Sequence, residues 1–139
     1  MGNYGFIYDS KSYVLEAEKC NYFSISEEAP VDGVDVSDVL RLLKESDEVD
    51  FDVEYYDQPC GICKEGIKEK AKYFKFLEYH FYIFSKNNKY VISNISKEYK
   101  NQTYNKMLKK GLVDNSYLVS VMVCLHCGDY SIEIEQCEV

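Results

Sequence analysis

Residues 59–63 read Pro-Cys-Gly-Ile-Cys, and residues 123–128 read Val-Cys-Leu-His-Cys-Gly. Each stretch contains a CxxC motif, in which the two cysteines stand at the spacing that lets a tight turn aim both thiolates at one ion. Two such motifs supply four thiolates, which complete the tetrahedral shell of a structural zinc site. We therefore predict that one Zn²⁺ per chain ties the fold together, with the ligands Cys60, Cys63, Cys124 and Cys127.

The second CxxC motif, with its glycine and the predicted strand that follows, resembles a knuckle of the zinc-ribbon proteins. The resemblance is limited to the two motifs and their flanking strands, and it implies a structural metal. The chain departs from compact zinc ribbons because 60 residues separate Cys63 from Cys124, against about 15–20 in compact sites. We therefore predict a single domain over residues 1–139, in which residues 64–123 form a folded insertion between the motifs.

Two further residues are alternative ligands that the sequence leaves open. Cys137 follows the second motif after ten residues and is a spare thiolate, although a buried thiol is its ordinary role. His126 lies inside the second motif, where its ring would compete with two better placed sulfurs. Cys20 is expected to be a small buried side chain, and His80, within an aromatic-rich stretch, is expected to be structural.

Composition and length describe a folded domain. The chain has 139 residues, of which 46% are hydrophobic and 15% aromatic, so it has the means to bury a core. No apolar run approaches the roughly 18 residues that span a bilayer, and no export signal is evident. In such a chain six cysteines are more readily metal ligands or reduced thiols than disulfides. We expect a cytoplasmic protein with no membrane association.

Charge is segregated along the chain. The net charge is -8, yet residues 64–110 hold 12 lysines and 4 glutamates, whereas the other residues hold 4 basic and 20 acidic side chains. This bipolar pattern predicts self-complementary packing and a protein partner contacted partly through charge.

The hydrophobic pattern predicts an α+β fold with a mostly antiparallel sheet and two helices. Residues 3–8 and 13–17 form a hairpin, and residues 19–23 continue its sheet. Ser37 caps a short helix that ends near residue 46, and a strand with an acidic outer face follows over residues 49–55. The later expected elements begin with a helical turn after the first motif and a strand from about residue 73 to 84, which a turn at Asn87–Asn88 joins to its hairpin partner at 90–93. A helix at 97–110 and a terminal hairpin of strands 117–123 and 130–135 follow.

The first alternative function is thiol–disulfide exchange at Cys60 and Cys63. The strand before the first motif and the order Cys-Gly-Ile-Cys-Lys resemble a thioredoxin active site, where a helix N-terminus lowers the first thiol's pKa. That family also places a cis-proline against the disulfide from a later strand. Both prolines of this chain, Pro30 and Pro59, precede the motif, so this partner is missing and the second motif is unexplained.

The second alternative is nonspecific nucleic-acid binding through residues 64–110, where lysines alternate with tyrosine and phenylalanine. The acidic pI near 4.8 and the presence of one arginine, Arg41, disfavour it. For catalysis the sequence lacks a phosphate-binding glycine loop, a nucleophile elbow and a His-Glu-x-x-His motif. We therefore predict a protein-binding module that is not an enzyme.

Overall fold

The computed structural model describes residues 3–46, 49–56, 74–99 and 101–137. Its strands are β1 (Asn3–Tyr8), β2 (Lys11–Glu16), β3 (Cys20–Ile25), β4 (Asp52–Tyr56), β5 (Phe74–Lys86), β6 (Lys89–Ser93), β7 (Asn115–Cys124) and β8 (Tyr130–Gln136). Its helices are α1 (Val36–Glu45) and α2 (Tyr104–Lys109), with short 3-10 turns η1 (Ala17–Lys19) and η2 (Lys97–Tyr99). The α+β class with two α-helices, expected from the sequence, is confirmed within these residues.

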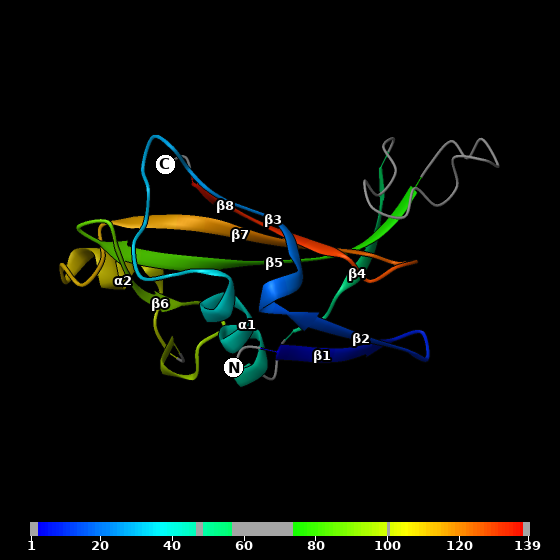
Figure 1. Ribbon diagram of the computed structural model, residues 1–139. Coiled ribbons are helices and arrows are strands. Elements are labelled where there is room, and N and C mark those ends of the chain that lie inside the picture. Colours follow the sequence, from blue (N-terminus) through cyan, green and yellow to red (C-terminus); the bar gives the residue numbers. More distant parts are fainter. Residues whose placement is uncertain (1–2, 47–48, 57–73, 100, 138–139) are drawn as a thin grey trace.

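A six-stranded sheet forms the body of the described chain, in the order β3-β8-β7-β5-β4, with β6 also paired to β5. The pairing is antiparallel except between β3 and β8, which run parallel. Strand β5 has 13 residues and pairs with β7 on one side and with β4 and then β6 on the other. The expected mostly antiparallel sheet is therefore confirmed, with one parallel pair at its edge (Figure 1).

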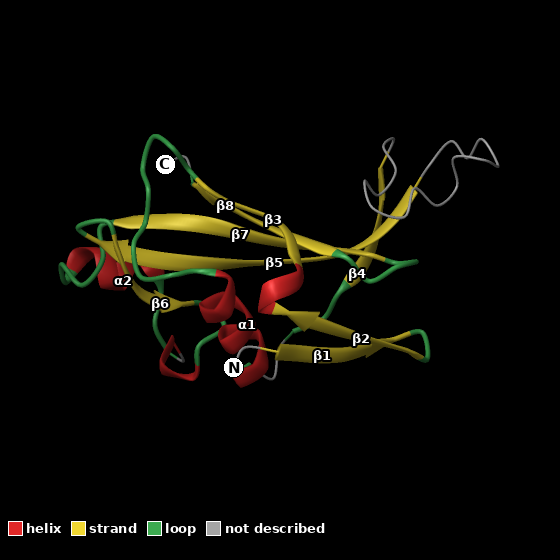
Figure 2. Cartoon of the chain, in the orientation of Figure 1, coloured by secondary structure: helices red, strands yellow, loops and turns green. Residues whose placement is uncertain are grey.

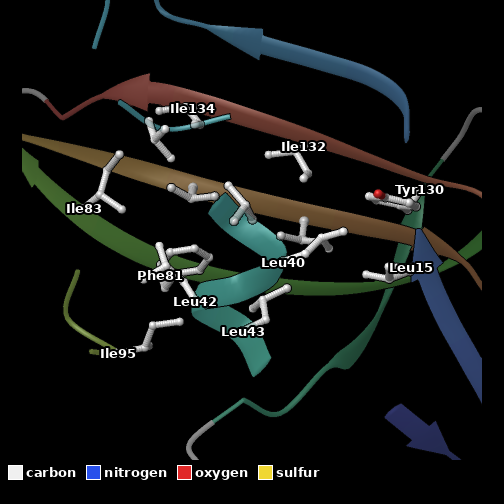
Figure 3. Close-up of a cluster of buried hydrophobic side chains, with 14 of the residues drawn as sticks. Leu15, Leu40, Leu42, Leu43, Phe81, Ile83, Ile95, Tyr130, Ile132 and Ile134 are labelled. Atoms are coloured by element: carbon white, nitrogen blue, oxygen red, sulfur yellow. The ribbon is translucent and has the colours of Figure 1, made fainter. Parts of the chain in front are cut away.

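One face of this sheet is covered, and we call it the covered face. Alternate residues of the central strands point into it, including Phe81, Val119 and Ile132, each at most 1% exposed. Helix α1 packs on them through Val39, Leu40 and Leu43, all fully buried. Figure 3 shows α1 lying across the strands with its leucines directed at them. This layer is the main hydrophobic core.

Helix α1 begins one residue before its predicted cap. Asp35, not Ser37, is the N-cap: its carboxylate accepts from the Asp38 amide at 3.0 Å, and the Asp38 carboxylate accepts from the Asp35 amide at 3.0 Å. This reciprocal capping box satisfies two N–H groups with ionised acceptors, which one serine hydroxyl does not match. The predicted end of the helix is confirmed, because Ser46 is the C-cap.

The N-terminal hairpin is separate from the large sheet, as Figure 2 shows. Strands β1 and β2 pair antiparallel through a tight turn at Asp9 and Ser10, both with positive φ. The hairpin is confirmed, whereas the expectation that residues 19–23 continue its sheet is wrong. Turn η1 redirects the chain, and β3 pairs with β8 instead.

The opposite face carries a second, smaller core at one end. Phe84 neighbours Ile83 on β5 and therefore points to the other face, where it packs with Met107 of α2 and Val113. The predicted continuous helix over 97–110 is wrong. Asn101 has φ +66°, which an α-helix does not accommodate, and Thr103 caps a new helix by accepting from the Lys106 amide at 3.1 Å. In the described chain no helix is long and apolar enough to cross a bilayer.

Candidate metal centre

The second CxxC motif sits at the tip of the β7–β8 hairpin. Cys124 is the last residue of β7 and is 4% exposed, whereas Cys127 lies in the turn and is exposed. The turn closes through two backbone hydrogen bonds, from Gly128 N to Cys124 O at 2.9 Å and from Cys124 N to Asp129 O at 2.7 Å. Gly128 has φ +79°, a left-handed conformation that glycine adopts without strain. The predicted strand, turn and return strand are thus confirmed.

Backbone amides in this turn point at both sulfurs. Cys127 N donates to Cys124 Sγ at 3.5 Å, and Asp129 N donates to Cys127 Sγ at 3.5 Å. Hydrogen bonds to sulfur favour the charged thiolate, which is the form that binds a metal. Such contacts are also the outer-shell support that orients metal ligands. Each sulfur of this turn therefore has one backbone amide directed at it.

The β1–β2 hairpin holds the other side of the turn. Lys11 Nζ donates to the carbonyl oxygens of Leu125 and His126 at 3.1 and 2.7 Å, and the Tyr13 hydroxyl donates to Leu125 O at 2.8 Å. The Tyr130 hydroxyl donates in the opposite direction, to Glu16 O at 2.6 Å. These bonds fix the backbone between the two cysteines against a separate structural unit.

A cavity of about 380 Å³ lies between this hairpin and the turn. Its lining includes Lys11 and Lys19 but also Glu16 and Asp129, and Lys19 is paired with Glu16 at 2.9 Å. Burial raises the pKa of the Asp129 carboxyl. Because both signs of charge line the cavity, no single class of ion is selected there.

The first CxxC motif, Cys60 and Cys63, lies outside the described residues, as does the helical turn expected after it. The described strands on either side of it, β4 and β5, meet it at the same end of the sheet as the second motif. Tyr56 pairs with Phe74, and Cys124 pairs with Phe76, so the Tyr56 and Cys124 backbones are about 12 Å apart across β5. Cys60 follows Tyr56 after four residues, a length that reaches about 13 Å when extended. The chain length is therefore compatible with one four-cysteine site.

Cys137 is not a candidate for this site. Its amide donates to Ser116 O at 3.0 Å, at the end of β7 remote from Cys124, which is about 27 Å away along the strand. Cys20 is the nearer thiol, because it pairs with Tyr130 directly after the turn. It is half-buried, and burial raises the pKa of its thiol. The short spacing from Cys127 wrongly indicated Cys137 as a spare ligand, because strand β8 runs away from the turn between the two residues.

A polar network on the sheet, which the sequence reasoning missed, joins three strands. His80 Nδ1 lies 2.9 Å from Ser120 Oγ, and its Nε2 lies 2.5 Å from a Glu78 oxygen. Glu78 also accepts from the Tyr56 hydroxyl. His80 is thus on the surface, with a side chain 45% exposed, and not within an aromatic core.

The network has the order hydroxyl, imidazole, carboxylate that is found in hydrolase triads. Catalysis of acyl transfer also needs N–H groups aimed at the developing oxyanion. In the middle of a sheet the backbone N–H groups of β5 and β7 are engaged in the ladder and lie in the sheet plane. We therefore interpret the network as a link between β4, β5 and β7. Only the strand register brings Ser120 opposite His80, so no sequence motif could have revealed it.

Comparison with known proteins places the chain in a family but assigns no activity. A family model described as "Protein of unknown function (DUF3785)" matches residues 4–139, so the chain belongs to that family. No curated protein matches the chain, and no solved structure does.

Proposed function

We propose that this member of the DUF3785 family is a zinc-stabilised binding module, in which one structural Zn²⁺ is held by Cys60, Cys63, Cys124 and Cys127. The observation that carries the proposal is the second motif's turn, where one backbone amide is directed at each sulfur. Two sulfurs that each accept a backbone hydrogen bond could supply half of the four ligands of a tetrahedral zinc site. The first motif is the remaining pair of thiols at CxxC spacing.

The metal would act on the fold and not on a substrate. Four thiolates leave no position for water or substrate, so the ion serves as a cross-link between distant parts of the chain. It would join the β4–β5 connection to the β7–β8 turn, and the β1–β2 hairpin packs on that turn through Lys11 and Tyr13. Metal affinity would therefore appear as folding stability.

The partner we propose is a protein. The face of the sheet opposite α1 carries apolar and acidic side chains, such as Tyr82 and Glu133, and has the mixed character of a protein contact. Within the described part of segment 64–110, the side chains of β5 divide between the core and the face that carries Glu78, so these residues form no uniform basic groove. The role is therefore binding, in the cytoplasm, without catalysis.

The test is native mass spectrometry of protein purified without added metal or chelator, with a free-thiol count after denaturation. We expect one zinc per chain and six reduced cysteines. Cys127→Ser should lose the metal and several kcal/mol of unfolding free energy. The matched control, Cys137→Ser, should keep both because that thiol is at the far end of β7. Wild-type protein without metal but with a Cys60–Cys63 disulfide would overturn the proposal and support thiol–disulfide exchange.

A further inference from the structure

The face of the sheet opposite α1 is open between its two ends, and we call it the open face. Its members alternate with core residues on five strands. They are Tyr22, Ser24, Asp52, Glu54, Tyr56, Phe76, Glu78, His80, Tyr82, Leu118, Ser120, Met122, Ser131, Glu133 and Glu135. Five of these side chains are acidic and none is lysine or arginine. The open face therefore joins negative charge to apolar surface.

One row of the open face, that of Tyr82 and Leu118, is largely apolar, and Met122, Tyr22 and Phe76 add apolar side chains in the rows beyond it. Tyr82 on β5 pairs with Leu118 on β7, which pairs with Glu135 on β8. Tyr82 is 45% exposed. Tyrosine is one of the residues that contribute most binding energy to protein interfaces, so this side chain is available to a partner. Rows nearer the candidate metal centre carry four of the five carboxylates, with Glu133 opposite Ser120 and Asp52 opposite Glu78, whereas Glu135 ends the Tyr82 row.

A ridge with positive charge borders this row on the other side. Helix α2 packs over Phe84, two positions beyond Tyr82 on β5, and so rises above the same face. Its residues Lys106, Lys109 and Lys110 are exposed. Beside them Leu108 and Leu112 are 42% and 52% exposed. Along β5 the order is thus lysine ridge, apolar row, acidic rows.

We infer that the occupant of the open face is a second copy of this chain, related by a two-fold axis near Tyr82 and Leu118. Such an axis sets each lysine ridge over the acidic rows of the other copy and brings the two apolar rows together. A uniformly basic partner would meet the lysine ridge, and a uniformly acidic one would meet the carboxylates. The complement must carry both signs in reversed order, which a two-fold copy provides.

The open face and the exposed side of α2 together form the proposed contact. The rows of the open face run from Leu118 to the row of Cys124, about 20 Å along β7, and four strands span about 19 Å. The flat area is therefore roughly 400 Å² before side-chain relief and the exposed side of α2 are added, about half of the ~800 Å² that each partner contributes to a standard interface. The inference uses three of the twelve lysines of residues 64–110, namely Lys106, Lys109 and Lys110. It deepens the binding role proposed above and rests on it, but it does not depend on the metal.

The experiment uses two charge-reversal variants of the full chain. In the acidic-row variant, Glu133→Lys and Glu135→Lys reverse the two carboxylates that β8 contributes to the acidic rows and to the end of the Tyr82 row. In the other, Lys106→Glu and Lys109→Glu reverse the ridge. Each variant alone should dissociate into monomers, with the dimer Kd raised at least about tenfold. In an equimolar mixture the two variants should form a heterodimer, because every contact again joins opposite charges. Glu27→Lys with Glu28→Lys, an exposed pair in the loop before α1, is the control with the same charge change and should still dimerise.

Native mass spectrometry and light scattering read the outcome. A wild-type chain that stays monomeric at roughly 100 µM, a mixture that fails to form the heterodimer, or a control that dissociates like the acidic-row variant would each overturn the inference. The spectra count zinc and chains together, so a zinc-loaded monomer refutes the dimer and leaves the metal proposal standing. A metal-free dimer would refute the metal proposal and support the dimer.

Discussion

Removal of the Tyr13 hydroxyl tests whether the N-terminal hairpin supports the turn of the second CxxC motif, which we propose binds zinc. In Tyr13→Phe the ring stays in place, 3% exposed, and the hydrogen bond to Leu125 O at 2.8 Å is lost. The same carbonyl keeps Lys11 Nζ at 3.1 Å. The change therefore loosens the backbone between Cys124 and Cys127 without altering either sulfur.

The expected magnitude follows from one buried hydrogen bond. A net contribution of about 0.5–1.5 kcal/mol is ordinary, and the remaining Lys11 contact keeps the loss near 1 kcal/mol. If the metal orders the turn, this energy is present in the zinc-bound state and absent from the metal-free state. A loss of about 1 kcal/mol then raises the zinc Kd about fivefold, somewhat less than typical outer-shell substitutions.

The assay is competition for zinc with a chromophoric chelator, combined with urea unfolding of the zinc-loaded and metal-free protein. Tyr117→Phe is the matched control, because its hydroxyl donates to Ala29 O at 2.7 Å and its ring is fully buried. That bond lies at the opposite end of β7 from Cys124. We expect Tyr117→Phe to lower stability by about 1 kcal/mol with and without metal, at an unchanged zinc Kd.

Two results would refute this reasoning. An unchanged zinc Kd in Tyr13→Phe would mean that the hairpin holds the turn equally without metal. An equal rise in Kd for Tyr117→Phe would mean that zinc affinity reports folding of the whole chain and not the local support of the turn.

Three further predictions concern stability, each measured by urea unfolding. Asp35→Ala should cost about 1 kcal/mol by removing the capping box of α1, whereas Ser37→Ala should change stability by less than about 0.5 kcal/mol; equal losses would contradict the cap assignment. Gly128→Ala should cost about 1–2 kcal/mol because φ is +79°, and an unchanged midpoint would argue against that conformation. Burial raises the pKa of Tyr4, Tyr13, Tyr90 and Tyr117 above 10.0. The unfolded chain then ionises first, so stability should be retained below about pH 10 and fall as the pH rises further; a flat profile to pH ~11 would contradict this.

Local signals in the sequence were reliable where one element or one turn decides the structure. The terminal hairpin with its alternating Tyr130, Ile132 and Ile134 was predicted correctly, and all three are buried. The Asn87–Asn88 turn was also correct, with φ of +53° and +66°. Such features depend on side-chain alternation and on the tolerance of asparagine for positive φ, both of which are written in neighbouring residues.

Predictions failed where distant residues compete for the same position. The pattern of residues 97–110 suits a helix, but the chain breaks at Asn101 so that Tyr99 and Tyr104 both stack on Phe84, at ring distances of 5.5 and 5.3 Å. Cys137 is only ten residues from Cys127 in the sequence. However, β8 is extended, so it places Cys137 at the other end of the sheet, beside Ser116. In residues 97–110 the tertiary contacts outweigh a local helix preference worth a few tenths of a kcal/mol per residue. The position of Cys137 follows from the pairing of β8 with β7.

The sequence by itself determined the class of fold, most of its strands, and the four cysteines as the candidate site, because periodicity and ligand spacing are properties of short segments. Only the tertiary structure decided which strands are neighbours. The register of β5 and β7 brought Ser120 opposite His80 and put the acidic rows on the face where the lysine ridge also lies. Packing and hydrogen bonds placed the β1–β2 hairpin against the second motif. Pairing between strands remote in sequence depends on burying a shared apolar face, and that energy belongs to the assembled sheet and not to any segment of it.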